Sequence, residues 1–372
     1  MNAKVSIIKC AGYDPLLVQE AVLKAIDLIG GITNFIKPQS KVLVKPNLLM
    51  AKEPEYGITT HPEVVRAVIK ILKTIDCQVF VGDDPNVRNS QNEKLDEIYE
   101  RTGMKRVCQE EGVTLVDFAK KRWRGNFPLA AWLDDSDHVV NIPKFKTHNL
   151  TVLSGAIKNL FGLVSGTYKA ELHKKYFAKD EFAGILVDVF QEVKPSLTVI
   201  DGIVAMEGDG PVMKGKLRNL GLILASADCV ALDSILASIM GLEPFDVLTT
   251  KEAAARGLGT ADINSISVLG EKLQEVNRGP FLLPGTPVKR RLPPQLARII
   301  NKFIFFYPSI ERKSCLACGM CVTACPKKAI RITKDQADID YRKCVYCFCC
   351  SGACPNSAIK VRKSLLAGFL GL

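Results

Sequence analysis

The chain has 372 residues, of which 47% are hydrophobic and 24% are charged, and its formal net charge is +11. These values are typical of a soluble globular protein with two or three domains, and the positive charge favours contact with an acidic partner. They exclude a membrane-spanning helix, because no apolar run approaches the ~18 residues that such a helix needs. Met1 to Cys10 hold too short an apolar run for a secretory signal, so a cytoplasmic location is predicted, where the 13 cysteines stay reduced.

From residue 1 to about 280, short β-branched runs alternate with longer helical patterns. Strands are predicted at Val5–Ile8, Lys41–Val44, Gln78–Val81, Thr114–Asp117, His138–Ile142, Leu197–Ile200, Leu220–Ala225 and Ile266–Leu269. Helices are predicted at Leu16–Ile29, Pro62–Ile75, Glu93–Thr102, Phe182–Val193 and Val230–Met240. This alternation predicts parallel strands with crossover helices, so residues 1–280 are expected to form a layered α/β domain with a mostly parallel sheet.

Polar motifs follow four of the predicted strands, at the point where each strand ends. They are Lys45-Pro46-Asn47, Gly82-Asp83-Asp84-Pro85, Pro143-Lys144-Phe145-Lys146-Thr147-His148 and Asp201-Gly202. The carboxyl ends of the strands are the edge at which open α/β sheets bind their ligands. Four such motifs together therefore predict one shared site.

The basic residues of this edge suggest an anion site. If the extended pattern continues past Pro143, then Lys144, Lys146 and His148 point to one side by two-residue alternation. Lysines there could hold a carboxylate or phosphate, and backbone amides at a helix start near Gly155 could add donors. A histidine could move a proton. The candidate catalytic residues are therefore Lys45, His61, Lys144, Lys146, His148 and Lys158.

A divalent cation is a second interpretation of the same edge. Its ligands would come from Asp83, Asp84, Asp201, Glu207 and Asp209, with His61 or His148 as borderline ligands. Structural roles are a third interpretation, because Asp83 and Asp201 could cap turns or helices and His61 stands at a predicted helix start. No glycine-rich dinucleotide loop, phosphate loop or nucleophile elbow is present, so those chemistries are not indicated.

Residues 281–310 are predicted to be a basic, proline-rich linker that leads into an amphipathic helix. Its basic residues, with two that follow it, are Lys289, Arg290, Arg291, Arg298, Lys302, Arg312 and Lys313. Apolar residues recur at helical spacing from Leu296 to Ile304. We favour packing of this face against the large domain, with peripheral contact at an anionic membrane as the alternative. Nucleic acid is not expected, because no binding motif and no basic stripe with interleaved aromatics is present.

Residues 311–362 contain the motif Cys-x2-Cys-x2-Cys-x3-Cys-Pro twice, with an offset of 29 residues. In two-cluster ferredoxins, the fourth cysteine of each motif ligates the other cluster. The first 4Fe–4S cluster is therefore assigned to Cys315, Cys318, Cys321 and Cys354. The second is assigned to Cys344, Cys347, Cys350 and Cys325. The segment is expected to be a small α+β ferredoxin-like module.

Zinc and disulfides are the alternatives for these cysteines. Zinc also uses Cys-x2-Cys pairs, but it requires neither a third cysteine two residues on nor the proline. A disulfide framework lacks the secretory segment that would accompany it. Cys349 breaks the offset and is expected to be a non-ligand, although it could hydrogen-bond a cluster sulfide. The isolated cysteines are expected to be buried small hydrophobes; they are Cys10, Cys77, Cys108 and Cys229.

Several motifs together resemble the prokaryotic domain-of-unknown-function family 362. They are Lys45-Pro46-Asn47, Thr60-His61-Pro62, Gly82-Asp83, Pro143 to His148, Ile157 to Gly162 and Glu207 to Pro211. The likeness covers roughly residues 40 to 260, and family members often carry a two-cluster ferredoxin module, as this chain does by its cysteine pattern. Asp84 departs from the small hydroxyl residue expected there. The resemblance implies an architecture and cluster content but no substrate.

These observations support three functions. The first is an iron–sulfur oxidoreductase that passes electrons to a small anionic substrate or cofactor held by the α/β domain. The second is an electron carrier or maturation partner that delivers electrons to another protein, with the α/β domain as a recognition module. In the third, the clusters are structural or sense oxidants while a metal-dependent reaction occurs elsewhere.

Overall fold

The computed structural model describes residues 3–85, 95–164, 168–169, 172, 176, 179–211, 215–276, 279–284, 306–325, 327–333, 335–344, 349–352, 354, 356 and 358–363. The chain forms two compact units. The first unit comprises Met1–Arg88, Glu93–Gly166 and Lys179–Pro284, and the second comprises Asn89–Asn92, Thr167–Ala178 and Gly285–Leu372. The helix predicted near Leu296 to Ile304 lies outside the described residues.

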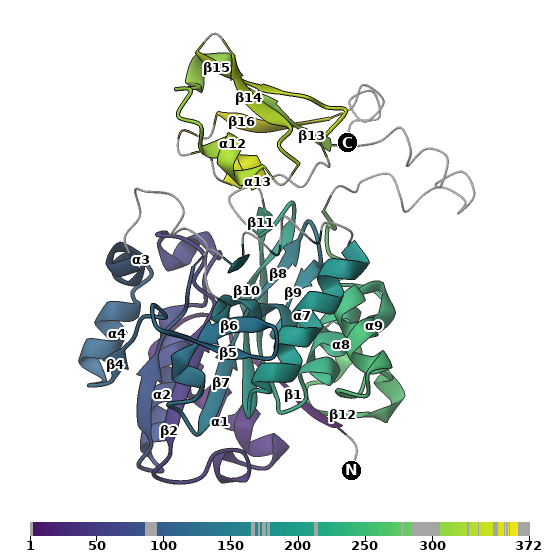
Figure 1. Ribbon diagram of the computed structural model, residues 1–372. Helices are drawn as coiled ribbons and strands as arrows, with labels where there is room; N and C mark the ends of the chain where they lie inside the picture. The colour runs from purple at the N-terminus through teal and green to yellow at the C-terminus, as the bar shows by residue number, and fades with distance from the viewer. Residues whose placement is uncertain are drawn as a thin grey trace. The chain divides into compact units, whose positions relative to one another are not determined.

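The first unit is built on a sheet whose main path runs in the order β12-β1-β11-β10-β7-β2-β3-β4 (Figure 1). The strands of this path are β1 (Ala3–Lys9), β2 (Lys41–Pro46), β3 (Gln78–Val81), β4 (Thr114–Leu115), β7 (His138–Ile142), β10 (Leu197–Gly208), β11 (Gly215–Ser226) and β12 (Ile266–Gly270). Off this path, β8 (Lys144–His148) pairs with β10 and with β9 (Val152–Ser154). A separate hairpin joins β5 (Lys121–Arg124) to β6 (Phe127–Ala130).

The predicted layered α/β fold with a mostly parallel sheet is confirmed, with one local difference. Strand β11 runs antiparallel to both of its neighbours, β1 and β10. The reason is that β10 and β11 are joined by a short turn, and a short connection permits only antiparallel pairing. The sequence pattern predicts these two strands but does not show that no crossover helix separates them.

Helices cover both faces of the sheet (Figure 1). The α-helices of the first unit are α1 (Pro15–Ile29), α2 (Pro62–Lys73), α3 (Leu95–Arg101), α4 (Met104–Glu110), α5 (Ala156–Asn159), α7 (Lys179–Val193), α8 (Cys229–Ile239), α9 (Leu248–Ala255) and α10 (Leu273–Val276). Short 3₁₀ turns lie at Ile32–Asn34, Pro54–Tyr56, Ala131–Leu133, Leu160–Leu163, Pro244–Asp246 and Ile263–Ser265. Among the described residues, no helix is long and apolar enough to cross a membrane.

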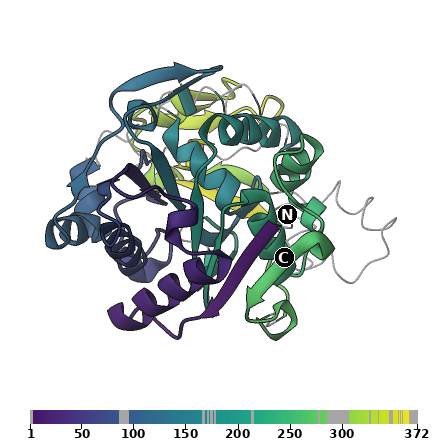
Figure 2. The same cartoon turned by 90° about the horizontal axis from the view of Figure 1, so that it is seen from below.

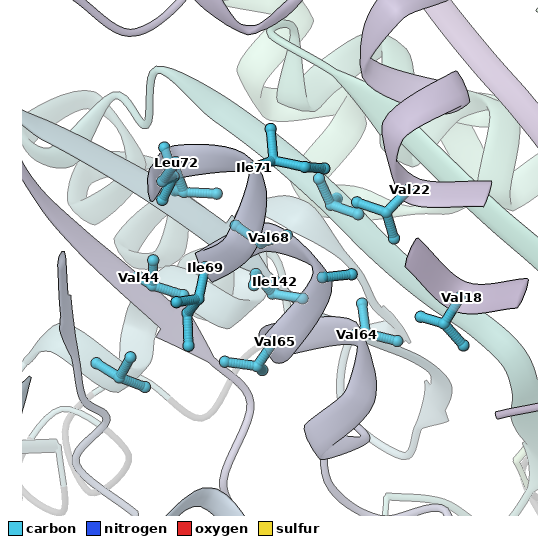
Figure 3. Close-up of a cluster of buried hydrophobic side chains, with 14 of the residues drawn as sticks. Val18, Val22, Val44, Val64, Val65, Val68, Ile69, Ile71, Leu72 and Ile142 are labelled. Atoms are coloured by element: carbon cyan, nitrogen blue, oxygen red, sulfur yellow. The ribbon is translucent and has the colours of Figure 1, made fainter. Parts of the chain in front are cut away.

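Helices α1 and α2 bury their apolar faces against one side of the sheet, where they form a core of buried hydrophobic side chains (Figure 3). The side chains labelled there are Val18 and Val22 of α1, Val64, Val65, Val68, Ile69, Ile71 and Leu72 of α2, Val44 of β2 and Ile142 of β7. Helix α1 runs beside β1 (Figure 2), and Ser6 Oγ donates to Ala25 O at 2.7 Å. Each such buried side chain contributes about 1.5–3 kcal/mol, so this layer fixes the position of the strand ends.

The second unit is a small α+β module, as predicted. Strand β13 (Phe306–Ile310) pairs antiparallel with β16 (Ile359–Lys363), and β14 (Ile330–Thr333) pairs antiparallel with β15 (Gln336–Ile339). Its helices are α12 (Met320–Ala324), α13 (Cys349–Gly352) and the short 3₁₀ turn Arg312–Ser314. Its core consists of Cys321, Ile330, Ala337, Ile339, Cys350 and Ile359. The pairs Cys321/Cys350 and Ile330/Ile359 keep the 29-residue offset, so the sequence repeat is also a repeat of core positions.

Candidate functional site

The first unit gathers buried charges where the strands β2, β3 and β7 end. Lys45 lies in β2, Asp83 follows β3, and Asp201 lies in β10. After Pro143 the chain continues directly into β8, which carries Lys144 and Lys146 and is therefore extended as expected. Lysines are almost never fully buried without a partner, yet Lys45, Lys144 and Lys146 are at most 1% exposed. With the half-buried Lys158 of α5, we call these four residues the lysine cluster.

Lys45 forms a buried ion pair with Asp83, in which Nζ and Oδ1 are 2.8 Å apart. The Leu48 amide donates to Asp83 Oδ2 at 2.7 Å, so the carboxylate is held from two sides. Burial lowers the pKa of Lys45, although the charge of Asp83 opposes the shift. Gly162 lies directly against this pair, since a Cβ there would overlap Asp83 Oδ1 and Lys45 Nζ. The ion pair therefore explains why position 162 is a glycine.

Lys144 forms the second buried ion pair, with Asp201, at 2.9 Å from Nζ to Oδ2. Tyr13, which no motif of the sequence singles out, completes this pair. Its hydroxyl donates to Asp201 Oδ1 at 2.8 Å and accepts a hydrogen bond from Lys144 Nζ at 2.7 Å. Burial raises the pKa of Tyr13, and the nearby Asp201 raises it further. Tyr13 lies in the loop after β1, so only the fold brings it to Asp201.

His61 connects this second pair to helix α2. Its backbone N–H donates to Asp201 Oδ2 at 2.8 Å, and its ring stacks on Tyr13 with centroids 3.6 Å apart. Its Nδ1 accepts from the Glu63 amide at 3.2 Å, so His61 is the N-cap of α2 and the neutral ring carries its proton on Nε2. Burial lowers its pKa to about 4. The structural role considered for His61 is thus observed.

His148 lies at the end of β8 and is half-buried. Its Nδ1 accepts from the amides of Leu150 and Thr151, at 3.2 and 3.3 Å. The ring therefore closes the turn that follows the strand. These local bonds give His148 a structural task that the alternation of β8 does not show.

Lys146 differs from Lys45 and Lys144 in its partners. Its Nζ donates to Asn47 Oδ1 and to Ile58 O, each at 2.6 Å. Within the described residues it forms no ion pair with a carboxylate. Burial lowers its pKa well below the usual value, and the charges of Lys158 and Lys144 lower it further. Lys146 is therefore the member of the cluster at which an added negative charge would be stabilised most.

Three of the five carboxylates proposed as cation ligands are engaged by basic side chains instead. Asp83 and Asp201 pair with lysines, and Glu207 pairs with Arg218 at 2.8 Å. In the part of the chain that the structure describes, no group of three or more histidine, cysteine or acidic side chains could hold a metal ion. The structure thus gives no support to a divalent cation near Asp83, Asp84, Glu207 and Asp209.

The helix start at Gly155 does not offer its amides to a bound anion. Asp233 of α8 accepts from the amides of Ala156 and Ile157, at 2.6 and 3.1 Å. A Cβ on Gly155 would overlap this carboxylate. Burial raises the pKa of Asp233 to about 7. The anion expected at this helix start is therefore the protein's own side chain.

The cysteines of the second unit line a cavity that combines both repeats. Its lining includes Cys315, Cys318 and Cys321 of the first motif together with Cys354 of the second. Burial raises the pKa of Cys321, and the proximity of the other three thiols raises it further. Four sulfurs around one cavity are the donor set that a 4Fe–4S cluster requires. The described lining therefore contains the four cysteines predicted for the first cluster, and their assignment as ligands stays a prediction.

The two cysteines that precede prolines share one hydrogen-bond pattern. The Ala329 amide donates to Cys325 Sγ and the Ala358 amide donates to Cys354 Sγ, both at 3.2 Å. Cys325 and Cys344 pack beside the core that contains Cys350. Cys347 and the side chain of Cys349 lie outside the described residues. The four isolated cysteines, Cys10, Cys77, Cys108 and Cys229, are buried and free.

Comparisons with known proteins match both units. The family model "Domain of unknown function (DUF362)" matches residues 42–238, and the model "4Fe-4S dicluster domain" matches residues 307–355. The thylakoid-associated protein sll1697 of Synechocystis sp. is 32% identical over 266 residues, which cover 69% of this chain and 81% of that protein. The lactate racemase apoprotein from Thermoanaerobacterium thermosaccharolyticum is 12% identical with a TM-score of 0.40, and the match covers 64% of this chain and 57% of that structure.

Proposed function

Because this chain belongs to the DUF362 family and carries a 4Fe–4S dicluster domain, we propose that it is an oxidoreductase that moves electrons through two 4Fe–4S clusters. The electrons would reach an anionic substrate or cofactor at the lysine cluster. The observation that carries the proposal is the shared cavity, in which Cys354 of the second motif joins Cys315, Cys318 and Cys321 of the first.

Each proposed cluster takes three ligands from one motif and the fourth from the other. Cys315, Cys318, Cys321 and Cys354 would hold the first cluster, and Cys344, Cys347, Cys350 and Cys325 the second. When bound, such clusters supply one-electron transfer. The amides of Ala329 and Ala358 donate to the two ligands that would cross between the repeats. Hydrogen bonds to the cluster sulfurs are one of the factors that set a reduction potential.

The lysine cluster would bind the anion. Lys45 pairs with Asp83 and Lys144 with Asp201, whereas the described acceptors of Lys146 are the neutral Asn47 Oδ1 and Ile58 O. A carboxylate or phosphate near Lys146 would supply the missing negative charge. It would also raise the pKa of Lys146, so binding in the pH range where Lys146 titrates should take up a proton. His61, whose pKa of about 4 leaves it neutral at pH 7, would donate a hydrogen bond from Nε2, because its Nδ1 already accepts from the Glu63 amide.

Binding can be measured with inorganic phosphate and small dicarboxylates by isothermal titration calorimetry. Uptake of a proton makes the observed heat depend on the ionisation enthalpy of the buffer, so two buffers at one pH should give different heats. Lys146→Met should remove this difference. Binding of none of these anions would count against the anionic substrate and leave the cluster assignment untouched.

An electron carrier or maturation partner is the alternative function, with the α/β domain as a recognition module. The observation that favours it is that hydrogen bonds within the protein already engage the buried lysines. A bound anion is therefore not needed to provide these lysines with hydrogen-bond acceptors. Recovery of a stable redox partner from a pull-down, with no small-molecule binding by the protein, would support this alternative over the oxidoreductase.

Peripheral contact with an anionic membrane is proposed for the basic segment between Lys289 and Lys313. Its charge and apolar spacing suit a membrane surface, and a relative is named as thylakoid-associated. Flotation with anionic vesicles should recover the protein, and replacing Lys289, Arg290 and Arg291 by serine should reduce the recovery. Equal recovery of both proteins, or none of either, would favour a cytoplasmic location.

Anaerobic purification tests the cluster content. The protein should contain about four iron atoms and four sulfides for each cluster. Cys318→Ser and Cys347→Ser should each lower the iron content, because each removes a ligand from a different cluster. A preparation that contains zinc in place of iron would refute the proposal.

A further inference from the structure

The surface around the first cysteine motif combines exposed apolar side chains with a candidate cluster ligand. Leu316 is 73% exposed and Ile332 is 39% exposed. Both line the same cavity as Cys318. Of the motif cysteines that the structure describes, only Cys318 is exposed. The first cluster site therefore has an edge that can approach an external molecule.

Basic side chains surround this apolar patch. Arg312 and Lys313 are exposed and lead directly into Ser314, which also lines the cavity. Arg331, next to Ile332, is 73% exposed, and the Asp338 that faces it is 55% exposed, so this ion pair is a weak surface contact. Between residues 306 and 363 there are eleven lysines and arginines against four acidic residues. The module as a whole therefore attracts negative charge.

We propose that Leu316, Cys318 and Ile332, with Arg312, Lys313 and Arg331 around them, form the docking surface for an acidic electron-carrier protein. The inference rests on the electron-transfer function proposed above and names the partner of its first cluster. In each encounter one electron moves between the two proteins, so that one is oxidised by one electron and the other is reduced by one.

A protein fits this surface better than a membrane or a nucleic acid. Weak redox complexes bury less than about 1,200 Å², with an apolar centre and a charged rim that steers association. Stable insertion into lipid needs a longer apolar face than two exposed side chains provide. Single-stranded nucleic acid needs stacking aromatics, and the described rim of this surface contains none.

The test is stopped-flow electron transfer from the dithionite-reduced, cluster-loaded protein to oxidised flavodoxin, an acidic carrier. Cytochrome c, a basic carrier, serves as the contrast. The second-order rate constant with flavodoxin should fall about tenfold or more between low and high salt, because screening weakens the attraction. The rate with cytochrome c should not fall with salt.

Substitutions inside and outside the proposed docking surface test where the electron carrier binds. Arg312→Glu should slow the reaction with flavodoxin about tenfold without changing the iron content. Lys251→Glu, in the exposed part of α9, makes the same change of charge in the first unit and should leave the rate within twofold. Leu316→Ser should slow the reaction without changing its salt dependence. Equal effects of Arg312→Glu and Lys251→Glu would overturn the proposal.

Two further outcomes separate this inference from its premise. If dithionite reduces the clusters but flavodoxin reacts slowly and without salt dependence, the docking surface is wrong and the electron-transfer function stands. If the protein holds no reducible cluster, the proposed function itself fails. If Arg312→Glu abolishes binding to anionic vesicles but leaves the flavodoxin rate unchanged, the surface serves lipid and the proposal is overturned.

Discussion

In the lysine cluster, two of the buried lysines pair with carboxylates from other segments, Lys45 with Asp83 and Lys144 with Asp201. In the cysteine module, the core of the described residues is small and includes two of the motif cysteines, Cys321 and Cys350. Both ion pairs are formed within the protein. In the cysteine module, proposed cluster ligands are part of the core, so we expect its stability to depend on the bound clusters. We therefore expect the loss of one cluster ligand to have a larger effect on the cysteine module than the loss of one ion-pair partner has on the first unit.

The largest effect is expected from Cys354, which is a proposed cluster ligand and also packs against the core of the module. Cys354→Ser should lower the iron content by about half, because a cluster needs four ligands. The module should also become sensitive to protease, since its core loses the group around which it packs. Iron analysis and limited proteolysis measure both effects.

Cys77→Ser is the matched control, because Cys77 is a buried free cysteine of the first unit. It should leave the iron content unchanged. An iron content in Cys354→Ser equal to that of the wild type would contradict the crossed assignment of ligands.

The next effect tests the ion pairs of the lysine cluster. Asp83→Asn should destabilise the first unit by about 3–5 kcal/mol, because it leaves the buried Lys45 without its charge partner. Glu252→Gln removes a carboxylate from the exposed pair with Arg256 and should cost less than about 1 kcal/mol. Urea unfolding of the two variants measures the difference, and equal costs would show that the buried pair is not a special source of stability.

A smaller effect is expected at Gly162. A Cβ there would overlap the Lys45–Asp83 pair, so Gly162→Ala should cost about 1–3 kcal/mol through forced rearrangement. Gly12→Ala is the control, because nothing lies within 4 Å of the position that its Cβ would occupy. If both variants unfold at the same urea concentration, the close approach of Gly162 to the ion pair has no energetic consequence.

At neutral pH the smallest effect is expected from His61, because its titration lies below pH 6.5. Its pKa falls from an ordinary 6.5 to about 4 in the folded protein, so its contribution to stability is fully present above pH 6.5 and is lost as the pH falls toward 4. The slope in this window is at most about 1.4 kcal/mol per pH unit. His61→Asn keeps an N-cap and should flatten the profile of unfolding free energy between pH 6.5 and 4. An unchanged slope would mean that His61 is not the group that titrates.

The sequence predicts the cysteine ligands better than the lysine cluster, for a physical reason. The ligands of the clusters lie between Cys315 and Cys354, so their spacing is a local property of the chain. The partners in the lysine cluster lie far apart, and Tyr13 and Asp201 are 188 positions apart. Alternation along β8 identifies Lys144 and Lys146, but it does not show which of them receives a carboxylate.

The helices and strands, like the site, can be predicted from the sequence only where they depend on local patterns. Helix α2 follows from its apolar periodicity and from Pro62 at its first turn, and β2 follows from its β-branched run. The antiparallel direction of β11 depends on the short β10–β11 turn. The amide of Ala156, just after Gly155, donates to Asp233, which lies 77 positions further along the chain. Both are contacts of the folded chain that no local pattern encodes.

Electron paramagnetic resonance of the dithionite-reduced, anaerobically purified protein tests the central claim most directly. Two neighbouring reduced 4Fe–4S clusters should give a spectrum broadened by magnetic coupling, and Cys318→Ser should simplify it to the signal of a single cluster. A colourless protein without a low-temperature signal, or a wild-type spectrum that Cys318→Ser leaves unchanged, would contradict the account.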